Sequence, residues 1–515
     1  MMSEYLGWLE YLFMRQITQW EIREMLYSKI GSYWVFTEYS NWTIWYLTAP
    51  IIGFILVLII KEEYSIWITL GTFIVNTMHC IFAFFIFLLN LRVVFFSLDV
   101  ELWQTISFNV DGLSLFYMLL TNILLVITMI IVFDDTYLTK VYCLALISIN
   151  ILLNIVFTIR DLFGFYISFE ALIIPMFIII GVWGARKEKV KAAYYFMMYT
   201  VGGSIILLLG ILKVWSIAGT TTLEILKTVE LTEAVKLFLF IGFLLSFAAK
   251  IPLFPFHIWL PLAHVEAPLA GSILLAGLLI KLGTYGFIRF ALPLTSTICI
   301  KFAPFIIMLS LISIIYASLS TIRQTDLKRI IAYSSIAHMG IANLSIFTFT
   351  KLGISASVIL QLAHGLVSSA LFILVTILYN HHHTRAIIYF RGMSLTMPLF
   401  SSLFVFFNLC NIGMPLTGNF IGEFLSILAG FQYSPIVAII ASISIVLSAC
   451  YALYLVARIC YGESSPYIEL SRDLNRKEFY ALLALTILIL LIGIFPNVLI
   501  YLINSGLRDV LINFK

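Results

Sequence analysis

Residues 245–268 read LSFAAKIPLFPFHIWLPLAHVEAP. The stretch starts like a membrane-spanning helix, but Lys250 lies among apolar residues and Pro252 and Pro255 follow it closely. A proline has no backbone N–H and interrupts the helical hydrogen bonds of the preceding turn. Irregular backbone within a membrane is tolerated only where it is buried in protein or lines a water-filled cavity. The stretch therefore predicts a broken membrane helix that leaves room for water beside a buried amine.

The composition of the whole chain is typical of a membrane protein. Of the 515 residues, 62% are hydrophobic and 11% are charged, and the mean hydropathy is +1.07. A soluble protein carries about 25% charged residues. Apolar runs long enough to cross about 30 Å of hydrocarbon recur along the chain. We therefore expect an all-α integral membrane protein with about fourteen transmembrane helices. The expected spans are 43–60, 65–89, 112–133, 138–159, 162–184, 192–217, 237–258, 268–290, 302–322, 329–349, 355–379, 399–428, 434–457 and 479–503.

Several classes of partner and cofactor are not indicated. The net charge of +4 is small and scattered, which argues against nucleic acid. The six cysteines form no CxxC pair, and the sequence has neither cluster- or haem-ligand spacing nor a Gly-rich nucleotide loop. We expect this chain itself to bind no cofactor and no metal. Residues 1–42 lack a compact apolar run behind a basic end, so we expect an N-terminal extension and no cleaved signal peptide.

An internal echo of the opening stretch suggests repeated units. IPLFPFHIWL (251–260) and MPLTGNFIGE (414–423) both place a proline early in a long span and follow it with further helix-breaking residues. They fall in spans 7 and 12, so we expect two five-helix repeats, helices 4–8 and 9–13, with broken helices 7 and 12. Because five is odd, the second repeat is inverted, an arrangement that marks the transport path in many transporters. The expected units are an extension (1–42), helices 1–3 (43–133), a first repeat (134–290), a second repeat (291–460) and a final helix with its tail (461–515).

The distribution of basic residues predicts the orientation. Loops after odd-numbered spans hold fifteen lysines and arginines, and loops after even-numbered spans hold eight. We therefore expect the odd loops on the cytoplasmic or matrix side and both termini on the opposite side.

Charged residues inside the spans are the candidate functional residues. Glu170 lies nine residues past Asp161, about 13 Å along a helix, where exposure to lipid would cost several kcal/mol. Its alternative role is a structural ion pair or a neutral, hydrogen-bonded carboxyl. Lys250 could instead snorkel to the interface, although apolar helix continues on both sides of it.

Lys281 and Glu423 are the most isolated of these charges. Lys281 falls near the middle of span 8, and burial favours the neutral form of a lysine, which allows it to give and take a proton. A tether to a neighbouring carboxylate is its alternative role. Glu423 is the only charged residue in the sixty-six residues from 392 to 457, so its partner must come from another helix or another subunit.

Two histidines lie within later spans. His338, in AYSSIAHMGIANL, is a candidate relay member because imidazole titrates nearest neutral pH, and His364 is a second candidate. A buried, hydrogen-bonded core histidine is the alternative for both. We expect His257 and His264 at the end of span 7 and in its loop, with Glu266 at the membrane interface. Carboxylate, lysine, lysine, histidine and carboxylate thus occupy successive spans, a pattern that favours proton movement coupled to a reaction elsewhere.

The stretches that carry these residues also resemble a known family. They closely resemble the antiporter-like subunits of NADH:quinone oxidoreductase, respiratory complex I, over roughly residues 108–460. The matching stretches are FNVDGLSLF (108–116), residues 245–268 quoted above, GSILLAGLLIKLGTYGFIR (271–289), TDLKRIIAYSSIAHMG (325–340), LAHGLVSSALF (362–372) and GMPLTGNFIGEF (413–424).

The resemblance implies a role for each candidate. Glu170 matches the helix 5 glutamate, which pairs with the helix 7 lysine, here Lys250. Lys281 matches the helix 8 lysine that links two half-channels, and His338 matches the helix 10 histidine. Glu423 matches the terminal helix 12 residue, a position that is lysine in sister chains, so its glutamate indicates one particular branch.

The resemblance also implies the setting of the chain. The expected function is proton translocation through buried Glu, Lys, His and water, coupled to quinone reduction elsewhere in the complex. FMN, iron–sulfur clusters and ubiquinone would be bound by other chains of the parent complex, with no redox chemistry in this one. The expected partners are other membrane-arm subunits, above all neighbouring antiporter-like chains, and the lipid of the mitochondrial inner membrane.

Two alternatives remain open from the sequence. The same motifs occur in multi-subunit Na⁺/H⁺ antiporters, which are driven by an ion gradient and not by a redox reaction. A purely structural membrane scaffold is a second alternative, although Lys281 and Glu423 make it energetically costly.

Overall fold

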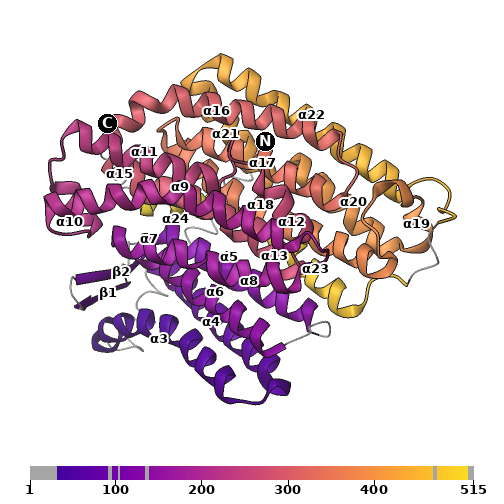
Figure 1. Ribbon diagram of the computed structural model, residues 1–515, viewed down its shortest axis with the longest axis horizontal. Helices are drawn as coiled ribbons and strands as arrows, with labels where there is room; N and C mark the ends of the chain where they lie inside the picture. The colour runs from indigo at the N-terminus through magenta and orange to yellow at the C-terminus, as the bar shows by residue number, and fades with distance from the viewer. Residues whose placement is uncertain (1–31, 91–95, 102–104, 134–138, 468–471, 508–515) are drawn as a thin grey trace, which may run out of the picture.

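Most of the residues that the structure describes lie in helices (Figure 1). The computed structural model describes residues 32–90, 96–101, 105–133, 139–467 and 472–507. Within these ranges, ten helices are long and apolar enough to cross a membrane, and Trp45–Ile59 and Pro398–Ile412 are shorter apolar segments. The expected all-α membrane architecture is confirmed, while the number fourteen and the two inverted repeats stay predictions.

The helix boundaries are as follows. The N-terminal part consists of α3 (Ser32–Ile59), α4 (Glu62–Asn90), α5 (Gly112–Val132) and α6 (Thr139–Thr158). The middle part consists of α7 (Leu162–Ala171), α8 (Ile173–Trp183), α9 (Lys189–Ala218), α10 (Leu223–Thr228), α11 (Glu233–Lys250), α12 (Trp259–Glu266), α13 (Leu269–Leu274), η1 (Leu275–Leu279), α14 (Ile280–Gly286), η2 (Phe287–Ala291) and α15 (Leu292–Leu294). The later part consists of α16 (Ser296–Ile322), α17 (Leu327–Ile346), α18 (Lys351–His382), η3 (Ile387–Tyr389), α19 (Met393–Thr396), α20 (Pro398–Ile412), α21 (Gly418–Tyr433), α22 (Pro435–Cys460), α23 (Arg476–Ile494) and α24 (Pro496–Gly506).

Three aspartates define helix starts. The Asp111 carboxylate accepts a hydrogen bond from Ser114 N at 2.9 Å and begins α5, and the Asp161 carboxylate accepts one from Gly164 N at 2.7 Å and begins α7. Asp326 begins α17 in the same way. A side-chain oxygen at this position satisfies one of the backbone donors that a helix start leaves free.

The two predicted helix breaks are present. Helix α11 ends at Lys250 and α12 starts at Trp259, and α20 ends at Ile412 before α21 starts at Gly418. Two further irregularities were not predicted. Helix 5 is interrupted at Leu172 between α7 and α8, and helix 8 contains the π-helical segments η1 and η2.

A short β-hairpin departs from the all-α expectation. Strands β1 (Phe96–Glu101) and β2 (Thr105–Val110) pair antiparallel and lead directly into Asp111. A two-stranded hairpin alone is marginally stable. Here Arg160 N donates to Ser107 O at 2.9 Å, which attaches the hairpin to the bundle. In addition, α3 starts at Ser32, within the segment that was expected to be an extension.

Uncharged polar side chains join the N-terminal helices. The Tyr46 hydroxyl in α3 donates to Asn154 Oδ1 in α6 at 2.7 Å and accepts from Asn122 Nδ2 in α5 at 2.8 Å. Asn154 Nδ2 then donates to Asn150 Oδ1 at 2.9 Å. We call these four residues the neutral network; all of them are buried.

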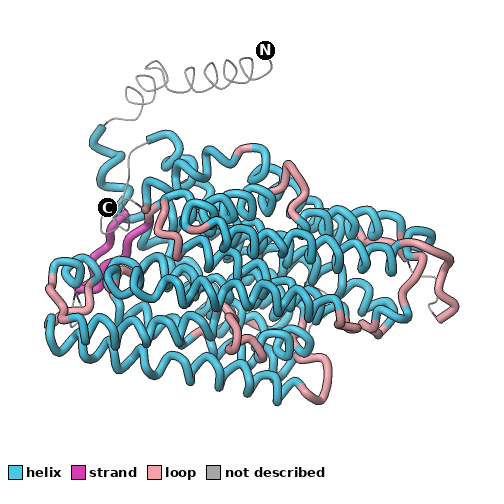
Figure 2. Tube along the Cα trace, turned by 90° about the horizontal axis from the view of Figure 1, so that it is seen from above, coloured by secondary structure: helices cyan, strands magenta, loops and turns pink. Residues whose placement is uncertain are grey.

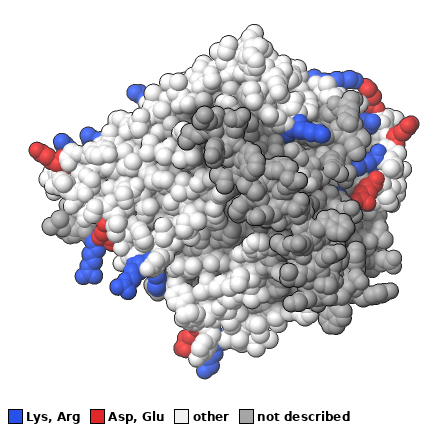
Figure 3. Space-filling view, turned by 180° about the vertical axis from the view of Figure 1, so that it is seen from behind, with Lys and Arg blue, Asp and Glu red and all other residues white. Residues whose placement is uncertain are grey.

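The bundle has two distinct ends. One end, here called the hairpin end, contains β1, β2 and α10, and the other, here called the α19 end, contains α19 (Figure 1). Figure 2 shows the two strands in magenta at one end of the bundle. Most of the charged side chains visible in Figure 3 lie toward the margins of that face, and the white area between them belongs to uncharged residues. Large apolar side chains such as Ile436 and Val446 are 68% and 65% exposed. Such a surface suits contact with lipid.

Candidate functional site

Lys250 is held against helix 5 close to the interruption at Leu172. It is the last residue of α11 and only 4% exposed. Its ammonium group donates to Phe169 O in α7 at 2.8 Å and lies 3.4 Å from the centre of the Phe169 ring. The carbonyl and the ring face both stabilise a cation that is removed from water.

Glu170 lies next to this contact but does not pair directly with Lys250. Between these two described side chains no ion pair is formed, because the lysine bonds to the preceding carbonyl instead. Glu170 Oε1 is buried without a hydrogen-bond partner. The two groups are nevertheless close enough for a Coulombic interaction. The expected direct pair is therefore replaced by a neighbouring, indirect one.

Lys281 is completely buried in α14. Its Nζ donates to Ala276 O at 2.7 Å, a bond to the residue five positions earlier that the π-helical segment η1 makes possible. On the other side the amine lies against α18, where Gly365 has no side chain. A Cβ at Gly365 would lie 3.1 Å from Lys281 Nζ.

His364, His338 and Glu423 continue from this point. His364 adjoins Gly365 in α18, and its ring centre lies 5.4 Å from that of His338 in α17. His338 Nδ1 lies 2.9 Å from Glu423 Oε1 in α21, although the two atoms lack the alignment of a hydrogen bond. His338 and Glu423 are 3% and 4% exposed. The partner of Glu423 thus comes from another helix, as expected.

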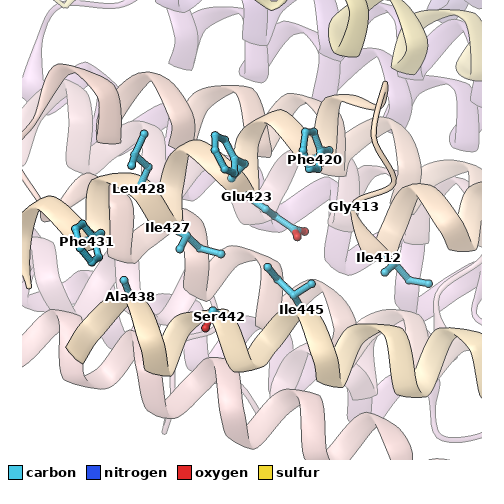
Figure 4. Close-up of a pocket in the computed structure, with 11 residues that line it drawn as sticks. Ile412, Gly413, Phe420, Glu423, Ile427, Leu428, Phe431, Ala438, Ser442 and Ile445 are labelled. Atoms are coloured by element: carbon cyan, nitrogen blue, oxygen red, sulfur yellow. The ribbon is translucent and has the colours of Figure 1, made fainter. Parts of the chain in front are cut away.

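A cavity opens beside Glu423. It has a volume of about 370 Å³ and is lined mainly by apolar residues of α21 and α22, including Phe424 and Ile445. Figure 4 shows the Glu423 carboxylate pointing into the space between these helices. Because Phe424 is 56% exposed, the cavity reaches the surface of the chain.

The structure thus places four of the six candidate residues in one continuous row, and the other two form a separate group. Lys281, His364, His338 and Glu423 follow one another across α14, α18, α17 and α21. Glu170 and Lys250 form a separate group on α7 and α11, and in the described part of the chain no hydrogen bond joins them to Lys281. Both groups can carry charge in a buried setting, which is what proton transfer requires.

Sequence reasoning missed a buried polar group toward the α19 end. His264 is fully buried in α12 and stacks on Phe372 at 4.8 Å between ring centres, so it is no loop residue. Lys328, which the span boundaries place in a loop, is 4% exposed and donates to Ala267 O at 2.9 Å. Glu266 is 5% exposed and is therefore buried within the chain, while its position at the membrane interface stays a prediction. The signal available in the sequence was the apolar run LPLA, which leads directly into His264.

A second missed feature is a buried charge cluster at the hairpin end. Arg289 donates two hydrogen bonds to the Asp111 carboxylate, both at 2.7 Å, and Arg160 Nη2 lies 3.3 Å from Asp111 Oδ2. We call these three residues the charge clasp. They join α5, the start of α7 and η2. Burial alone would raise the pKa of the Asp111 carboxyl, but the two guanidinium groups lower it well below its usual value.

Metal-ligand geometry is not found in the residues that the structure describes, where no group of three or more His, Cys, Asp or Glu side chains converges.

Comparison with known proteins identifies the family. The family model described as "NADH:quinone oxidoreductase/Mrp antiporter, TM" matches residues 160–448. A curated relative from Metridium senile, "NADH-ubiquinone oxidoreductase chain 4", is 51% identical over 77% of this chain and 81% of its own length. A relative of the same name from Marchantia polymorpha is 42% identical over 90% of this chain and 95% of its own length. The chain belongs to this NADH:quinone oxidoreductase/Mrp antiporter family, in the branch whose curated members are named NADH-ubiquinone oxidoreductase chain 4.

Solved structures show the same fold. A chain of respiratory complex I from Thermus thermophilus with bound NADH superposes with a TM-score of 0.83 and 27% identity, covering 91% of this chain and 99% of that one. A chain of the Mrp complex from a Dietzia species also has a TM-score of 0.83, at 17% identity, covering 92% and 98% of the two chains. The second likeness shows the fold alone.

Proposed function

We propose that the chain is a proton-translocating membrane-arm subunit of NADH:ubiquinone oxidoreductase, complex I, in the mitochondrial inner membrane. It contributes no redox chemistry of its own. FMN, the iron–sulfur clusters and ubiquinone belong to other chains of the complex, and neighbouring antiporter-like chains are its partners in the membrane arm. The observation that carries the proposal is the buried row Lys281, His364, His338 and Glu423 in a chain of this family.

The row supports proton transfer because each member can exist in two protonation states. A buried charge is stable only next to an opposite charge or a set of oriented dipoles. Glu423 Oε1 lies 2.9 Å from His338 Nδ1, so a proton that moves from Lys281 toward His338 would arrive beside a carboxylate. When the charge of Glu423 is compensated from outside this chain, that stabilisation falls.

Glu170 and Lys250 are proposed to couple this row to the neighbouring subunit. Glu170 influences Lys250 through space, and Lys250 is held by Phe169, which precedes Glu170 in the chain. A charge that changes next to Glu170 would alter the stability of the Lys250 ammonium. Charge interactions in a low-dielectric interior are worth several kcal/mol at most, which is sufficient to move a proton between such groups.

Ordered water is proposed to join the members of the site. Buried polar atoms in proteins almost always have hydrogen-bond partners. In the described residues several buried atoms along the site have no protein partner, among them Glu170 Oε1, Ser246 Oγ, both ring nitrogens of His364 and both amide atoms of Asn419. These positions suit bridging water molecules.

Replacement of Lys281 tests the proposal. Lys281→Met keeps most of the side-chain volume and removes the proton carrier, so we expect NADH-driven proton translocation to fall at least about tenfold per assembled complex. Lys301→Met is the matched control, because Lys301 is an exposed lysine that pairs with Glu233 at 2.9 Å. Translocation is measured in sealed membrane vesicles and normalised to assembled complex on native gels. An unchanged rate in Lys281→Met would contradict the proposal.

Co-purification separates this function from that of a Na⁺/H⁺ antiporter subunit, which the family description also includes. Flavin- and iron–sulfur-containing chains that purify with this one support complex I. Sodium-driven proton exchange without these chains would support the antiporter.

A further inference from the structure

A buried cluster of hydroxyl and amide groups lies between Lys281 and the hairpin end. The Tyr117 hydroxyl in α5 donates to Gln361 Oε1 in α18 at 2.7 Å. The Thr284 hydroxyl in α14 lies 2.6 Å from the same oxygen and 2.8 Å from Lys281 O. Gln361 Nε2 donates to Ser357 Oγ at 2.8 Å. All four side chains are completely buried, and we call them the hydroxyl node.

The node lies one helical turn from the proton-carrying row on two helices at once. Thr284 follows Lys281 by three residues in α14, and Gln361 precedes His364 by three residues in α18. Residues three apart share one helix face. Because the helix that contains α14 leads toward Arg289 at the hairpin end and α18 starts near that end, both spacings point in the same direction.

Further polar groups continue from the node to the surface at the hairpin end. Tyr285, the residue after Thr284, accepts a hydrogen bond from Arg289 Nε at 3.2 Å and donates to Phe157 O at 3.0 Å. Arg289 belongs to the charge clasp, and Arg160 of the clasp lies 3.9 Å from Glu224, whose side chain is 70% exposed. The sequence of groups thus extends from the buried Lys281 to solvent.

An aromatic layer interrupts this sequence at one place. The Tyr117 ring stacks on Phe157 at 5.2 Å, and the Tyr285 ring meets Tyr117 nearly edge-on at 5.4 Å between centres. Between the described residues no hydrogen bond links the hydroxyl node with the Tyr285 hydroxyl, so the hydrogen-bonded sequence is interrupted here.

We propose that the hydroxyl node is the outward half of the proton path in this chain, through which the proton of Lys281 leaves toward the hairpin end. The proposal rests on the proposed function. The charge distribution of the loops predicts that the hairpin end, which follows even-numbered spans, faces away from the matrix.

The transfer is a proton relay in which no electrons move. The Lys281 ammonium, whose Nζ donates to Ala276 O on the side away from the node, releases one proton and becomes neutral, and water carries that proton to a hydroxyl of the node. That hydroxyl then releases its own proton on the side of the hairpin end. Thr284 and Tyr117 are the relay groups. Gln361 is a positioning residue, because its single Oε1 orients both hydroxyls and carries no proton itself.

The arrangement also explains how the route stays closed. The Tyr117 hydroxyl has one proton, which Gln361 Oε1 engages, and the Thr284 hydroxyl shares its one proton between two acceptors. Neither hydroxyl has a proton left to donate toward the aromatic layer. Passage therefore requires rotation of the Tyr117 or Gln361 side chain, which prevents free flow of protons between Lys281 and the hairpin end.

A pair of substitutions at Thr284 tests the relay. Thr284→Val has the same shape without the hydroxyl, whereas Thr284→Ser keeps the hydroxyl and loses only a methyl group. We expect Thr284→Val to lower NADH-driven proton translocation per assembled complex at least about tenfold, and Thr284→Ser to remain near the parent protein. A solvent deuterium isotope effect that is larger in Thr284→Val than in Thr284→Ser is a second readout, which a purely structural role would not change.

Tyr117→Phe is an independent variant that removes a single oxygen and keeps the ring in the aromatic layer. We expect a similar loss. Thr295→Val is the matched control, because Thr295 is equally buried but its hydroxyl donates to Ala291 O, away from the node.

The outcomes separate this inference from the proposed function. If Thr284→Val and Tyr117→Phe both translocate protons at the parent rate while Lys281→Met does not, the outward route lies elsewhere and the inference is wrong. If Lys281→Met also retains the parent rate, the proposed function of this chain fails first. An equal loss in Thr284→Val and Thr284→Ser would assign the node a packing role and would equally overturn the inference.

Discussion

Gly365 is the residue on which the position of the Lys281 amine depends. A Cβ there would lie 3.1 Å from both Lys281 Nζ and Leu120. We expect Gly365→Ala to push the amine away from His364 and to lower proton translocation severalfold, because proton transfer requires hydrogen-bond distances. The measurement is NADH-driven translocation in vesicles, relative to assembled complex.

Gly202→Ala provides the control for this substitution. Gly202 lies in α9, and a Cβ at this position would meet no atom within 4 Å. Equal translocation in the Gly365→Ala and Gly202→Ala variants would show that the amine does not need its contact with α18.

For single residues, the sequence predicts which charged side chains are buried but not which groups they contact. Glu423 could be singled out because its surroundings in the sequence are uncharged. That His338 lies 2.9 Å from it depends on the packing of α17 against α21, which no local pattern encodes. The same limit explains the Lys250 contact, where the acceptor is a backbone carbonyl exposed by the packing of two helices.

The break between α20 and α21 depends on a glycine. Gly413 ends α20 with φ +87°, a backbone conformation that disfavours side chains, and a Cβ there would lie 3.1 Å from Glu423 Oε2. We expect Gly413→Ala to destabilise the chain by about 1–2 kcal/mol, because a left-handed residue with a side chain is strained by that amount. The measurement is the temperature at which half of the complex disassembles on native gels.

Gly181→Ala is the comparison for Gly413→Ala. Gly181 lies in α8, where an added Cβ would meet no atom within 4 Å. A midpoint temperature of Gly413→Ala equal to that of Gly181→Ala would mean that the break tolerates a side chain.

The helix interruptions that the sequence predicts and those that it does not predict have different chemical causes. Prolines near Lys250 and before Thr417 mark the two predicted breaks. The interruption at Leu172 was not predicted, but Pro175 explains it, because proline has no N–H that could donate to Ala171 O. The π-helical segment η1 arises from a shift of hydrogen-bond register within apolar helix. Such a shift has no residue signature, although it supplies the carbonyl that binds Lys281.

The charge clasp joins the part of the chain before residue 160 to the part that the family model matches. We expect Asp111→Asn to destabilise the chain by about 3–5 kcal/mol, because two buried guanidinium groups lose their common counter-charge while the helix cap is kept. The assembled complex should decrease strongly, as measured on native gels.

Glu233→Gln is the control for Asp111→Asn, because it removes an ion pair at the surface of the chain. Its pair with Lys301 is exposed, so we expect no measurable change in assembly. If Asp111→Asn assembles as well as Glu233→Gln, the clasp does not stabilise the fold.

At the scale of the whole molecule, the membrane class and the two breaks were predictable from composition and proline positions. The clasp was not, because Arg160 and Arg289 fall at the ends of spans in the sequence and only the folded chain brings them to Asp111. Arg160, Arg289 and Lys328 are buried and were counted among the loop charges. Without them the loops after odd-numbered spans still hold more basic residues, so the predicted orientation stays the same. The hydroxyl node was equally hidden, since its members come from three separate helices.

The neutral network of Tyr46, Asn122, Asn150 and Asn154 has an electrical consequence. A transmembrane voltage does work on a net charge that changes its depth, about 2.3 kcal/mol per elementary charge per 100 mV, and does little on hydroxyls and amides. The helices α3, α5 and α6 therefore respond weakly when the membrane is energised. Voltage sensitivity should be concentrated in the lysine, histidine and glutamate side chains from residue 160 onward, so that the N-terminal helices form a passive frame for the charges that move.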